Sequence, residues 1–546
     1  MKGRPFLAGL LVVALLALGL GWGGWWWVWQ RGPLQLQHHT LTIPRAARFV
    51  PRQAPLALYL FSDGERPVDY TRAVAPLRQR REAIKSVERL RDGAFAAAGL
   101  DYHDELASWL APEMALSVLD APEGEGGGSW LLALSSKDEE GARRFLQRFW
   151  QARSLAGSGL QISQYRGMGL ISGRGALVGR DPVPLATALV QDDLVLIASG
   201  RATLERALDV SQIEALNEAG LAPLQEGVAS LGEGMALVVA RSGAFGPWLG
   251  LPALETNSGA SAPLLVGALQ PRGTQLVLNG LLHTPAEATE IPPDPLEPAP
   301  GPGEMPLPEP ALLSGLGGRS DSLAILRHPG ALQRIPWLGP LVRRITTPSA
   351  GGPLPPLLAA ADPGVLLLSQ SPEGWLAGTS GPIPHPDILE AGLAAEGLIE
   401  APLEVAGEQV TVWTHLRAIG GSEGRNKGSG EGLRASVAGW RRQGEGVAWW
   451  GETLAQLQNR SPGRGLLARQ RQLARLNRPD APLRWVLGDE AASKLLQHWR
   501  PWTLMTTLAG GGLADGPRDL AFALDAPEHG TTRWTARIDF APGSHG

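Results

Sequence analysis

The sequence contains no cysteine. This absence excludes disulfide bonds, thiolate catalysis, iron–sulfur clusters and cysteine-ligated zinc. It also excludes a bacterial lipoprotein anchor, because such an anchor is built on an acylated cysteine. Lysine is nearly absent too, and arginine supplies almost all of the basic residues. The only lysines are Lys2, Lys85, Lys137, Lys427 and Lys494, a scarcity that we attribute to the base composition of the genome rather than to phosphate binding.

The chain has no excess of basic residues. Its 49 lysines and arginines stand against 53 acidic residues, which gives a formal charge of −4 and a pI near 6.2. A nucleic-acid-binding protein needs a basic surface that displaces counterions, so this balance argues against that class. With 44% hydrophobic and 19% charged residues the composition is globular. A chain of 546 residues is longer than a domain with a single hydrophobic core usually is, so we expect two or more domains.

No catalytic motif has the context that its chemistry requires. Gly420–Gly424 (GGSEG) fits the G-x-S-x-G pattern, but a serine nucleophile needs a strand before it and a helix after it, and this segment lies in a glycine-rich loop. The adjacent His38 and His39 lack further ligands for a metal. The acidic residues Asp104 and Glu105 are explained by the first turn of a helix. We therefore predict no catalytic residue, no cofactor-binding residue and no metal ligand, although a triad can still assemble from distant residues.

An uncharged apolar run extends from Pro5 to Trp29 and follows Lys2 and Arg4. Its length suffices to span a bilayer, and its terminal cluster of tryptophans is typical of a membrane interface. The run lacks an A-x-A-like cleavage site, which favours an uncleaved signal anchor over a cleaved signal peptide. The positive-inside rule then predicts that the amino terminus is cytoplasmic and that the bulk of the chain lies outside the cytoplasm.

Six landmarks occur twice in the same order. Pro112–Leu119 (PEMALSVL) and Trp130–Ser136 (WLLALSS) have counterparts in Pro363–Ser369 (PGVLLLS) and Trp375–Ser380 (WLAGTS). A helix pattern, two more strand patterns and a second helix pattern follow in each copy. The offset between the copies stays near roughly 245 to 252 residues, which indicates a tandem duplication.

These patterns predict the organisation of the chain. We expect a transmembrane signal anchor at 1–31, a tether at 32–54, a first module at 55–284, a proline-rich acidic linker at 285–318 and a second module at 319–546. Each module is predicted to be α+β, with a mainly antiparallel sheet and helices on one face. The reason is that strand pairs joined by short turns alternate with single helices.

The first module is expected to open with a strand and a long amphipathic helix over Asp69–Ala98. The polar side of this helix is rich in basic residues: Arg78, Arg80, Arg81, Lys85 and Arg89. A basic amphipathic helix can contact anionic headgroups, but a solvated outer face is the commoner outcome, and we interpret the helix in that way.

The first half of the chain also resembles a known family. The matching features are a D-Y-x-x-E-L-x-x-W-L segment (Asp101–Leu110), an apolar strand before Lys137-Asp138, a Tyr165-x-Gly167 element and an L-E-x-A-L-D helix (Leu204–Asp209). Together with the N-terminal span they resemble the bacterial, mainly cyanobacterial domain of unknown function 3352. The second half departs further. The resemblance implies a cyanobacterial membrane-tethered protein, and it implies no activity. Together with the positive-inside rule, it leads us to expect a plasma or thylakoid membrane protein with its bulk in the periplasm or lumen.

Two functions remain open. The first is a non-enzymatic binding or scaffolding protein, held at the membrane by its N-terminal helix and contacting a protein partner in the envelope. The duplicated module and the lack of a catalytic motif favour this function. The second is an envelope hydrolase or isomerase with a site in the cleft between the two modules, which would require convergent polar groups in a pocket.

Overall fold

The computed structural model describes most of the chain outside the N-terminal segment. The described residues are 32–120, 128–154, 159–176, 182–251, 262–284, 309–335, 337–346, 353–362, 364–380, 383–419, 432–444, 447–459, 461–510 and 516–540. The motif at Gly420–Gly424 and the apolar run at 1–31 lie outside them.

The chain divides into two compact units. Unit 1 comprises Met1–Ala240, Val266–Val277 and Leu504–Leu513, and unit 2 comprises Arg241–Leu265, Leu278–Thr503 and Ala514–Gly546. The chain passes from one unit to the other within strands β9 (Leu264–Arg272) and β10 (Gln275–His283) and within helix α16 (Arg500–Leu508).

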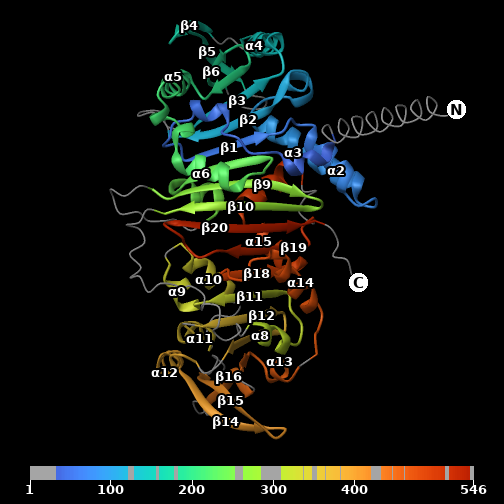
Figure 1. Ribbon diagram of the computed structural model, residues 1–546, viewed down its shortest axis with the longest axis vertical. Coiled ribbons are helices and arrows are strands. Elements are labelled where there is room, and N and C mark those ends of the chain that lie inside the picture. The colour runs from blue at the N-terminus through green and yellow to red at the C-terminus, as the bar shows by residue number, and fades with distance from the viewer. Residues whose placement is uncertain are drawn as a thin grey trace, which may run out of the picture. The chain divides into compact units, whose positions relative to one another are not determined.

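Unit 1 is built on an antiparallel sheet (Figure 1). Its strands are β1 (Leu56–Phe61), β2 (Leu110–Leu119), β3 (Ser129–Ser136), β4 (Gln161–Tyr165), β5 (Met168–Ala176), β6 (Pro182–Val190), β7 (Leu194–Ala198) and β8 (Ala236–Arg241). They pair in the order β8–β1–β2–β3–β7–β6–β5–β4. The continuous apolar sequence of β7, LVLIA, is buried at every position, as expected for a strand covered on both faces.

The helices of unit 1 lie between these strands in the chain. They are α2 (Arg66–Val74), α3 (Arg80–Ala97), α4 (Glu139–Ser154), α5 (Arg201–Val210) and α6 (Ala222–Leu231), with short turns η1 (Pro33–His38), η2 (Arg45–Phe49), η3 (Tyr102–Leu106), η4 (Glu214–Leu216) and η5 (Glu218–Gly220). The predicted helix over Asp69–Ala98 is two helices instead. Pro76 causes the break, because the residue before a proline avoids helical geometry, and Ala75 is extended.

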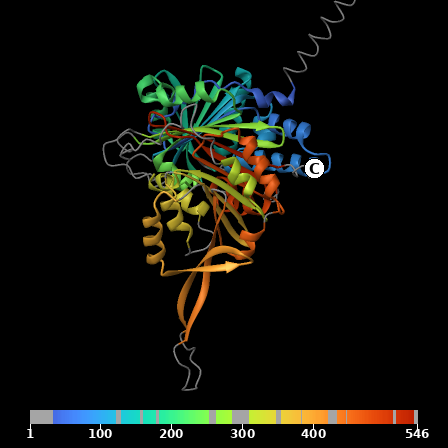
Figure 2. The same ribbon diagram turned by 60° about the horizontal axis from the view of Figure 1, so that its bottom comes forward.

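Unit 2 contains a longer antiparallel sheet. Its strands are β11 (Ser322–Arg327), β12 (Val365–Ser371), β13 (Gly374–Ser380), β14 (Leu398–Val405), β15 (Glu408–Ile419), β16 (Gly432–Gly444), β17 (Val447–Gly451), β18 (Leu483–Leu487), β19 (Asp519–Leu524) and β20 (Thr531–Asp539). They pair in the order β20–β19–β18–β11–β12–β13–β17–β16–β15–β14. Figure 2 shows the long strands β15 and β16 (orange) extending beyond the rest of this sheet.

Helices join the strands of unit 2 as well. They are α7 (Ser242–Ala244), η6 (Phe245–Leu249), α8 (Glu309–Gly315), α9 (Pro329–Arg334), α10 (Gly339–Thr346), α11 (Leu354–Ala360), α12 (Pro386–Ala395), α13 (Leu454–Gln458), α14 (Leu466–Leu476) and α15 (Asp489–Gln497). A capping box between Thr453 and Gln456 begins α13. Helix α8 lies within 285–318, which the sequence analysis assigned to a linker.

The two sheets have the same strand order. Adding ten to each label of the unit 1 order gives β18–β11–β12–β13–β17–β16–β15–β14, which is the order found in unit 2. Helices α4 and α12 follow the third strand of their units, and α5 and α13 follow the seventh. The arrangement is the one that a tandem duplication produces. The predicted α+β class and antiparallel pairing are confirmed.

The prediction that helices cover only one face of each sheet was wrong. Leu132 and Leu134 of β3 pack with Phe145 of α4 in one apolar cluster. Leu131 and Ala133, which point to the opposite face, are equally buried, and α5 contacts the same strand. The central strands are therefore covered on both faces, which explains why they are continuous apolar runs rather than alternating ones.

The prediction of a transmembrane helix also needs correction. Within the described ranges, no helix combines the length and the apolar character needed to cross a bilayer. The longest, α3, has 18 residues and carries charged side chains along its length, which are costly in hydrocarbon. The segment to which the transmembrane helix was assigned, 1–31, lies outside the described residues.

Residues 32–54, predicted to form a tether, pack against unit 1 instead. The backbone N–H of Leu41 donates to the carbonyl of Gly232 at 2.8 Å, and that of Gly234 donates to the carbonyl of His39 at 2.9 Å. The buried apolar side chains of this segment are Leu36, Leu41, Ala46, Ala47, Phe49, Val50 and Ala54. Prolines and polar residues interrupt these side chains, so the segment has no periodicity from which its packing could be predicted.

His39 is expected to make this packing depend on pH. Its ring stacks on Phe61 with centroids 5.4 Å apart. Burial, and then the charge of Arg66, lower the pKa of His39 from its ordinary value of 6.5. A lowered folded-state pKa stabilises the packed segment above pH 6.5, and this contribution is lost as the pH falls.

Hydrogen exchange can measure this loss. After correction for intrinsic rates, amides of residues 32–54 should exchange faster at about pH 5.5 than at about pH 7.5. His39→Gln should remove the difference, because glutamine does not titrate. A difference that persists in the variant would contradict the role of His39.

Candidate functional site

A row of apolar side chains crosses three adjacent strands of unit 1 and is only partly covered. Leu58 of β1 lies directly opposite Leu116 of β2 on one side and Val238 of β8 on the other. Leu116 is 43% exposed, although it lies in the interior of the sheet, and Leu58 and Val238 are half-buried. We call these three residues the apolar row.

Helix α4 covers the same face of the sheet beyond the apolar row. Leu132 is the partner of Leu116 in β3, and Ile197 is the partner of Leu132 in β7. These two residues are 7% and 2% exposed, and they pack with Phe145 and Phe149 of α4. On β2 this cover reaches Met114, which is 6% exposed in the same cluster, and it ends before Leu116, two residues further along on the same face. The apolar row is therefore left open to solvent.

Unit 2 covers the corresponding row with its own chain. Ala324 of β11 lies between Leu368 of β12 and Trp485 of β18, and the three are 1%, 1% and 6% exposed. Gln370, two residues beyond Leu368 on the same face, donates its side-chain N–H to the carbonyl of Ile345 in α10 at 2.6 Å. Helix α10 therefore covers, in unit 2, the sheet face that corresponds to the exposed face of unit 1.

The rows of the two units lie on corresponding faces of their sheets. In unit 2, Leu457 of α13 packs with Leu323 and Leu367, which alternate with the row residues and so point to the opposite face. In unit 1, α5 occupies the chain position of α13, and the cluster beneath α4 contains no residue of α5. The apolar row of unit 1 therefore faces away from α5, and the corresponding row of unit 2 faces away from α13.

A buried polar pair lies on the other face of β1. The hydroxyl of Tyr59 donates to Oε2 of Glu218 at 2.6 Å, and both side chains are 0% exposed. Burial, followed by the charge of Glu218, raises the pKa of Tyr59 well above its ordinary value. The neutral Tyr59 hydroxyl, by donating to Glu218, holds η5 against the sheet. Because both side chains are fully buried, no substrate can reach them.

The acidic residues singled out in the sequence line a small cavity of unit 1. The cavity has a volume of about 270 Å³ and is lined by Asp104, Glu105, Ser108, Trp109, Asp138, Gly141, Arg144, Phe145 and Arg148. Asp101 accepts a hydrogen bond from the backbone N–H of Asp104 at 2.8 Å. Glu105 accepts from Arg153 at 3.3 Å, so these carboxylates serve the start of η3 and an ion pair. No three acidic or histidine side chains among the described residues are placed to hold a metal ion.

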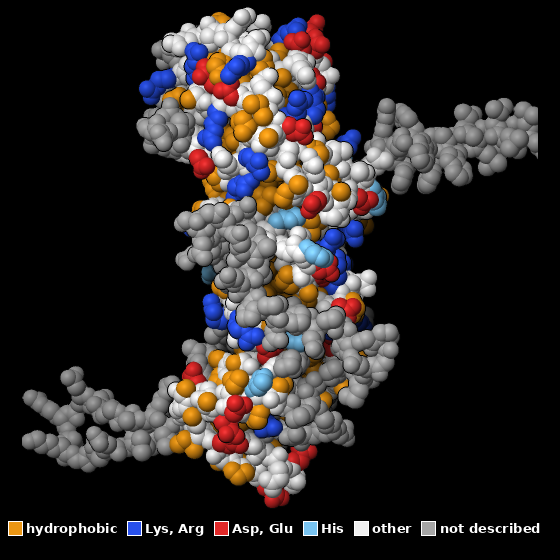
Figure 3. Space-filling view, turned by 60° about the vertical axis from the view of Figure 1, so that its left-hand side comes forward, with side chains coloured by type: hydrophobic (Ala, Val, Ile, Leu, Met, Phe, Trp, Pro, Cys, Tyr) orange, Lys and Arg blue, Asp and Glu red, His pale blue; other side chains and the backbone are white. Residues whose placement is uncertain are grey.

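Two surface arginines of unit 1 pair with neighbouring carboxylates. Arg45 donates to both carboxylate oxygens of Asp193 at 2.9 Å, and this hydrogen bonding lowers the pKa of Asp193. Arg143 pairs with Asp192 at 2.7 Å. On the side of the molecule in Figure 3, acidic and basic side chains are interspersed with apolar ones.

The apolar row cannot be recognised in the sequence, because its exposure depends on where a helix covers the sheet. The pattern of β2 predicts a buried strand, and a strand pattern does not say whether a helix covers each part of its face. His38 and His39 form no metal site: His38 lies 3.5 Å from Glu233, and His39 stacks on Phe61.

Comparison with known proteins links the chain to one family. A family model described as "Protein of unknown function (DUF3352)" matches residues 10–312. No curated protein matches the chain. Among solved structures, crystal forms IV and I of TP0453 are 12% and 13% identical to it. Each alignment covers 44% of this chain and 80% or 78% of the other, with a TM-score of 0.24, so it carries no argument.

Proposed function

The chain belongs to the DUF3352 family of proteins of unknown function, and we propose that it is a non-enzymatic binding protein whose unit 1 receives an apolar helix of a protein partner. The observation that carries the proposal is the exposure of Leu116. This side chain is 43% exposed in unit 1, whereas Leu368 in the corresponding row of unit 2 is 1% exposed beneath α10.

The cover in unit 2 suggests the chemistry of the partner. Val342 and Ile345 of α10 are 0% and 1% exposed, while Arg343 and Arg344 face solvent. This i, i+3 pattern is that of an amphipathic helix lying on an apolar surface. A partner helix with the same pattern would bury the apolar row at a gain of about 25 cal/mol per Å² of apolar surface.

The polar groups near the apolar row favour binding over catalysis. Tyr59 and Glu218 hold each other on the opposite face and are fully buried. Glu113 of β2 accepts a hydrogen bond from the backbone N–H of Ala46 at 3.2 Å. The row itself offers leucine and valine side chains, which supply affinity but no acid, base or nucleophile.

Photo-crosslinking tests the proposal directly. A photoreactive phenylalanine at Val118, which lies beside Leu116 on the same face, should form a covalent adduct with one partner protein in the native cell. Adding Leu116→Glu should reduce that adduct at least about tenfold, because a carboxylate would have to be buried without a partner. The matched control is Ile213→Glu, which changes an apolar residue that is 53% exposed outside the row.

The outcomes separate the alternatives. An adduct that is lost with Leu116→Glu and kept with Ile213→Glu supports the binding function. If no adduct forms, or if both variants reduce it equally, the apolar row is not a docking site and the proposed function fails.

A further inference from the structure

Helices α2 and α3 meet at a rigid corner. The backbone N–H of Ala75 donates to the carbonyl of Thr71 at 2.9 Å, and that of Gln79 donates to the carbonyl of Pro76 at 3.0 Å. The Nε–H of Arg80 donates back to the carbonyl of Ala75 at 3.2 Å. These bonds and the proline fix the direction of the residues at the tip.

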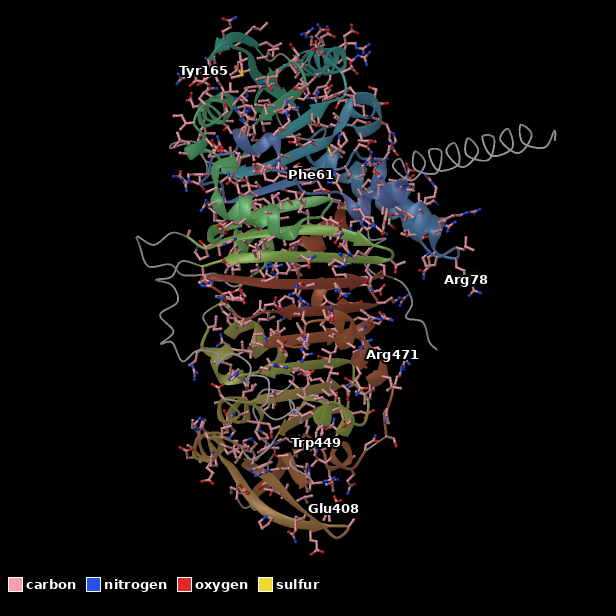
Figure 4. The ribbon with its side chains drawn as sticks, in the orientation of Figure 1. Phe61, Arg78, Tyr165, Glu408, Trp449 and Arg471 are labelled. Atoms are coloured by element: carbon pink, nitrogen blue, oxygen red, sulfur yellow. The ribbon has the colours of Figure 1, made fainter. Side chains whose placement is uncertain are left out.

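An apolar side chain stands at the tip of this corner. Leu77 is 81% exposed, although the neighbouring helices are fixed by the hydrogen bonds above. Arg78, labelled in Figure 4, follows it at the outer end of the connection between α2 and α3. Moving this leucine side chain from water into an apolar environment would be favourable.

Basic side chains that form no ion pair with the described residues follow Leu77 in the chain. Residues 78–91 contain six basic and two acidic residues, in a chain whose overall charge is −4. Four of the basic side chains are exposed and form no ion pair with the described residues: Arg78, Arg81, Lys85 and Arg89. Arg91, in contrast, pairs with Glu65 at 2.9 Å and with Asp92 at 2.8 Å. We call Leu77 and the four unpaired basic residues the basic corner.

The basic corner lies along one face of α3. The spacing of Arg81, Lys85 and Arg89 is four residues, which places them one above another on the helix. Ile84 and Val87 point away from this face and are half-buried. Glu88 and Asp92 lie further along this face, and Asp92 pairs with Arg91. An anionic surface that accepts Leu77 would therefore contact Arg78, Arg81 and Lys85, the three residues of the basic corner that are nearest to Leu77 in the chain.

We propose that the basic corner binds an anionic lipid surface, with Arg78, Arg81 and Lys85 on headgroup phosphates and Leu77 among the acyl chains near the headgroups. Charge complementarity and the exposed leucine argue for lipid together. Nucleic acid fits less well, because Leu77 offers no aromatic platform on which bases could stack. This inference is independent of the apolar row and of the partner proposed for it.

The lack of cysteine makes a site-specific test simple. Gln79→Cys introduces a single thiol into this cysteine-free chain, at an exposed side chain that makes no capping hydrogen bond. A fluorophore on this thiol should be quenched by spin-labelled lipid in vesicles of phosphatidylglycerol and phosphatidylcholine in equal amounts, and not in vesicles of phosphatidylcholine alone. Because quenching reports one position, attachment by another part of the chain would not produce it.

Helix α14 offers a matched control. Leu467 is 53% exposed and lies near the exposed Arg464, Arg471 and Arg475. A fluorophore on Leu467→Cys should stay unquenched with both kinds of vesicle. Equal quenching at positions 79 and 467, or none at position 79, would overturn the proposal.

Charge removal gives the expected size of the effect. Each basic residue near an anionic surface strengthens binding about fivefold, so Arg78→Gln, Arg81→Gln and Lys85→Gln together should raise the lipid concentration for half-quenching about 100-fold. Arg464→Gln, Arg471→Gln and Arg475→Gln remove the same charge from α14 and should leave it unchanged. If both triple variants weaken quenching alike, the net charge of the chain is responsible and the basic corner is not a lipid site.

Discussion

Replacing Glu309 by glutamine is expected to destabilise unit 2 by about 3–5 kcal/mol, the cost of breaking a buried ion pair from one side. The Glu309 side chain is 13% exposed and lies between Arg327, at 10%, and Arg484, at 6%. Its Oε2 accepts from both guanidinium groups, at 3.2 Å in the case of Arg327. Without the carboxylate, two positive charges remain buried in one site.

Few other groups near this cluster offset the cost of burying the charges of Arg327 and Arg484. Asp480 lies 3.8 Å from Arg327 but is 73% exposed, so solvent screens it. The Nε atoms of Arg327 and Arg484 are buried and have no hydrogen-bond partner among the described residues. Arg327 also donates to the carbonyl of Pro479 at 2.7 Å, but Glu309 is the buried carboxylate that neutralises both arginines.

Hydrogen exchange resolves this effect because it reports each unit separately. In Glu309→Gln, the amides of β11 and β18, which carry the two arginines, should lose protection, and those of β1 and β2 should keep it. Glu490→Gln is the control, since it removes one partner of an exposed i, i+4 ion pair with Lys494 and should change nothing. Unchanged protection of β11 and β18 would mean that the arginines find other partners.

The same cluster illustrates what the sequence could not predict. Glu309 lies at the end of a proline-rich acidic stretch, so its sequence context predicts a linker. Its partners are 18 and 175 residues away, and only the pairing of β11 with β18 brings them together. An ion pair of this kind depends on tertiary structure, and no local pattern encodes it.

Local patterns did predict the elements that depend on local physics. Continuous apolar runs such as Trp130–Ser136 predict strands, and the recurrence of this run as Trp375–Ser380 indicates two copies whose strand order proves to be the same. The candidate site could not be predicted from the sequence, because Leu116 has the sequence context of a core residue. Its exposure depends on where α4 ends over the sheet, which is a property of packing between elements.

Gly465→Ala is expected to destabilise unit 2 by about 3 kcal/mol or more, through backbone strain and a steric clash. Gly465 precedes α14 and has φ +82°, a conformation that favours glycine. A Cβ at this position would lie 2.4 Å from the carbonyl oxygen of Ser320. That oxygen belongs to a backbone that is fixed by the hydrogen bond from Ser320 N–H to the carbonyl of Arg464 at 3.1 Å, so it cannot move without breaking the contact between the two segments.

Gly397→Ala separates the clash from the strain. Gly397 also has a positive φ, +69°, but a Cβ there would have no heavy atom within 4 Å. This variant should cost only about 1 kcal/mol, the conformational penalty alone. Urea unfolding monitored by exchange in α14 and in β14 measures both changes. If the two variants cost the same, the approach of Ser320 to Gly465 adds nothing to the stability of unit 2; a larger loss at Gly465 means that this close backbone contact determines where α14 begins.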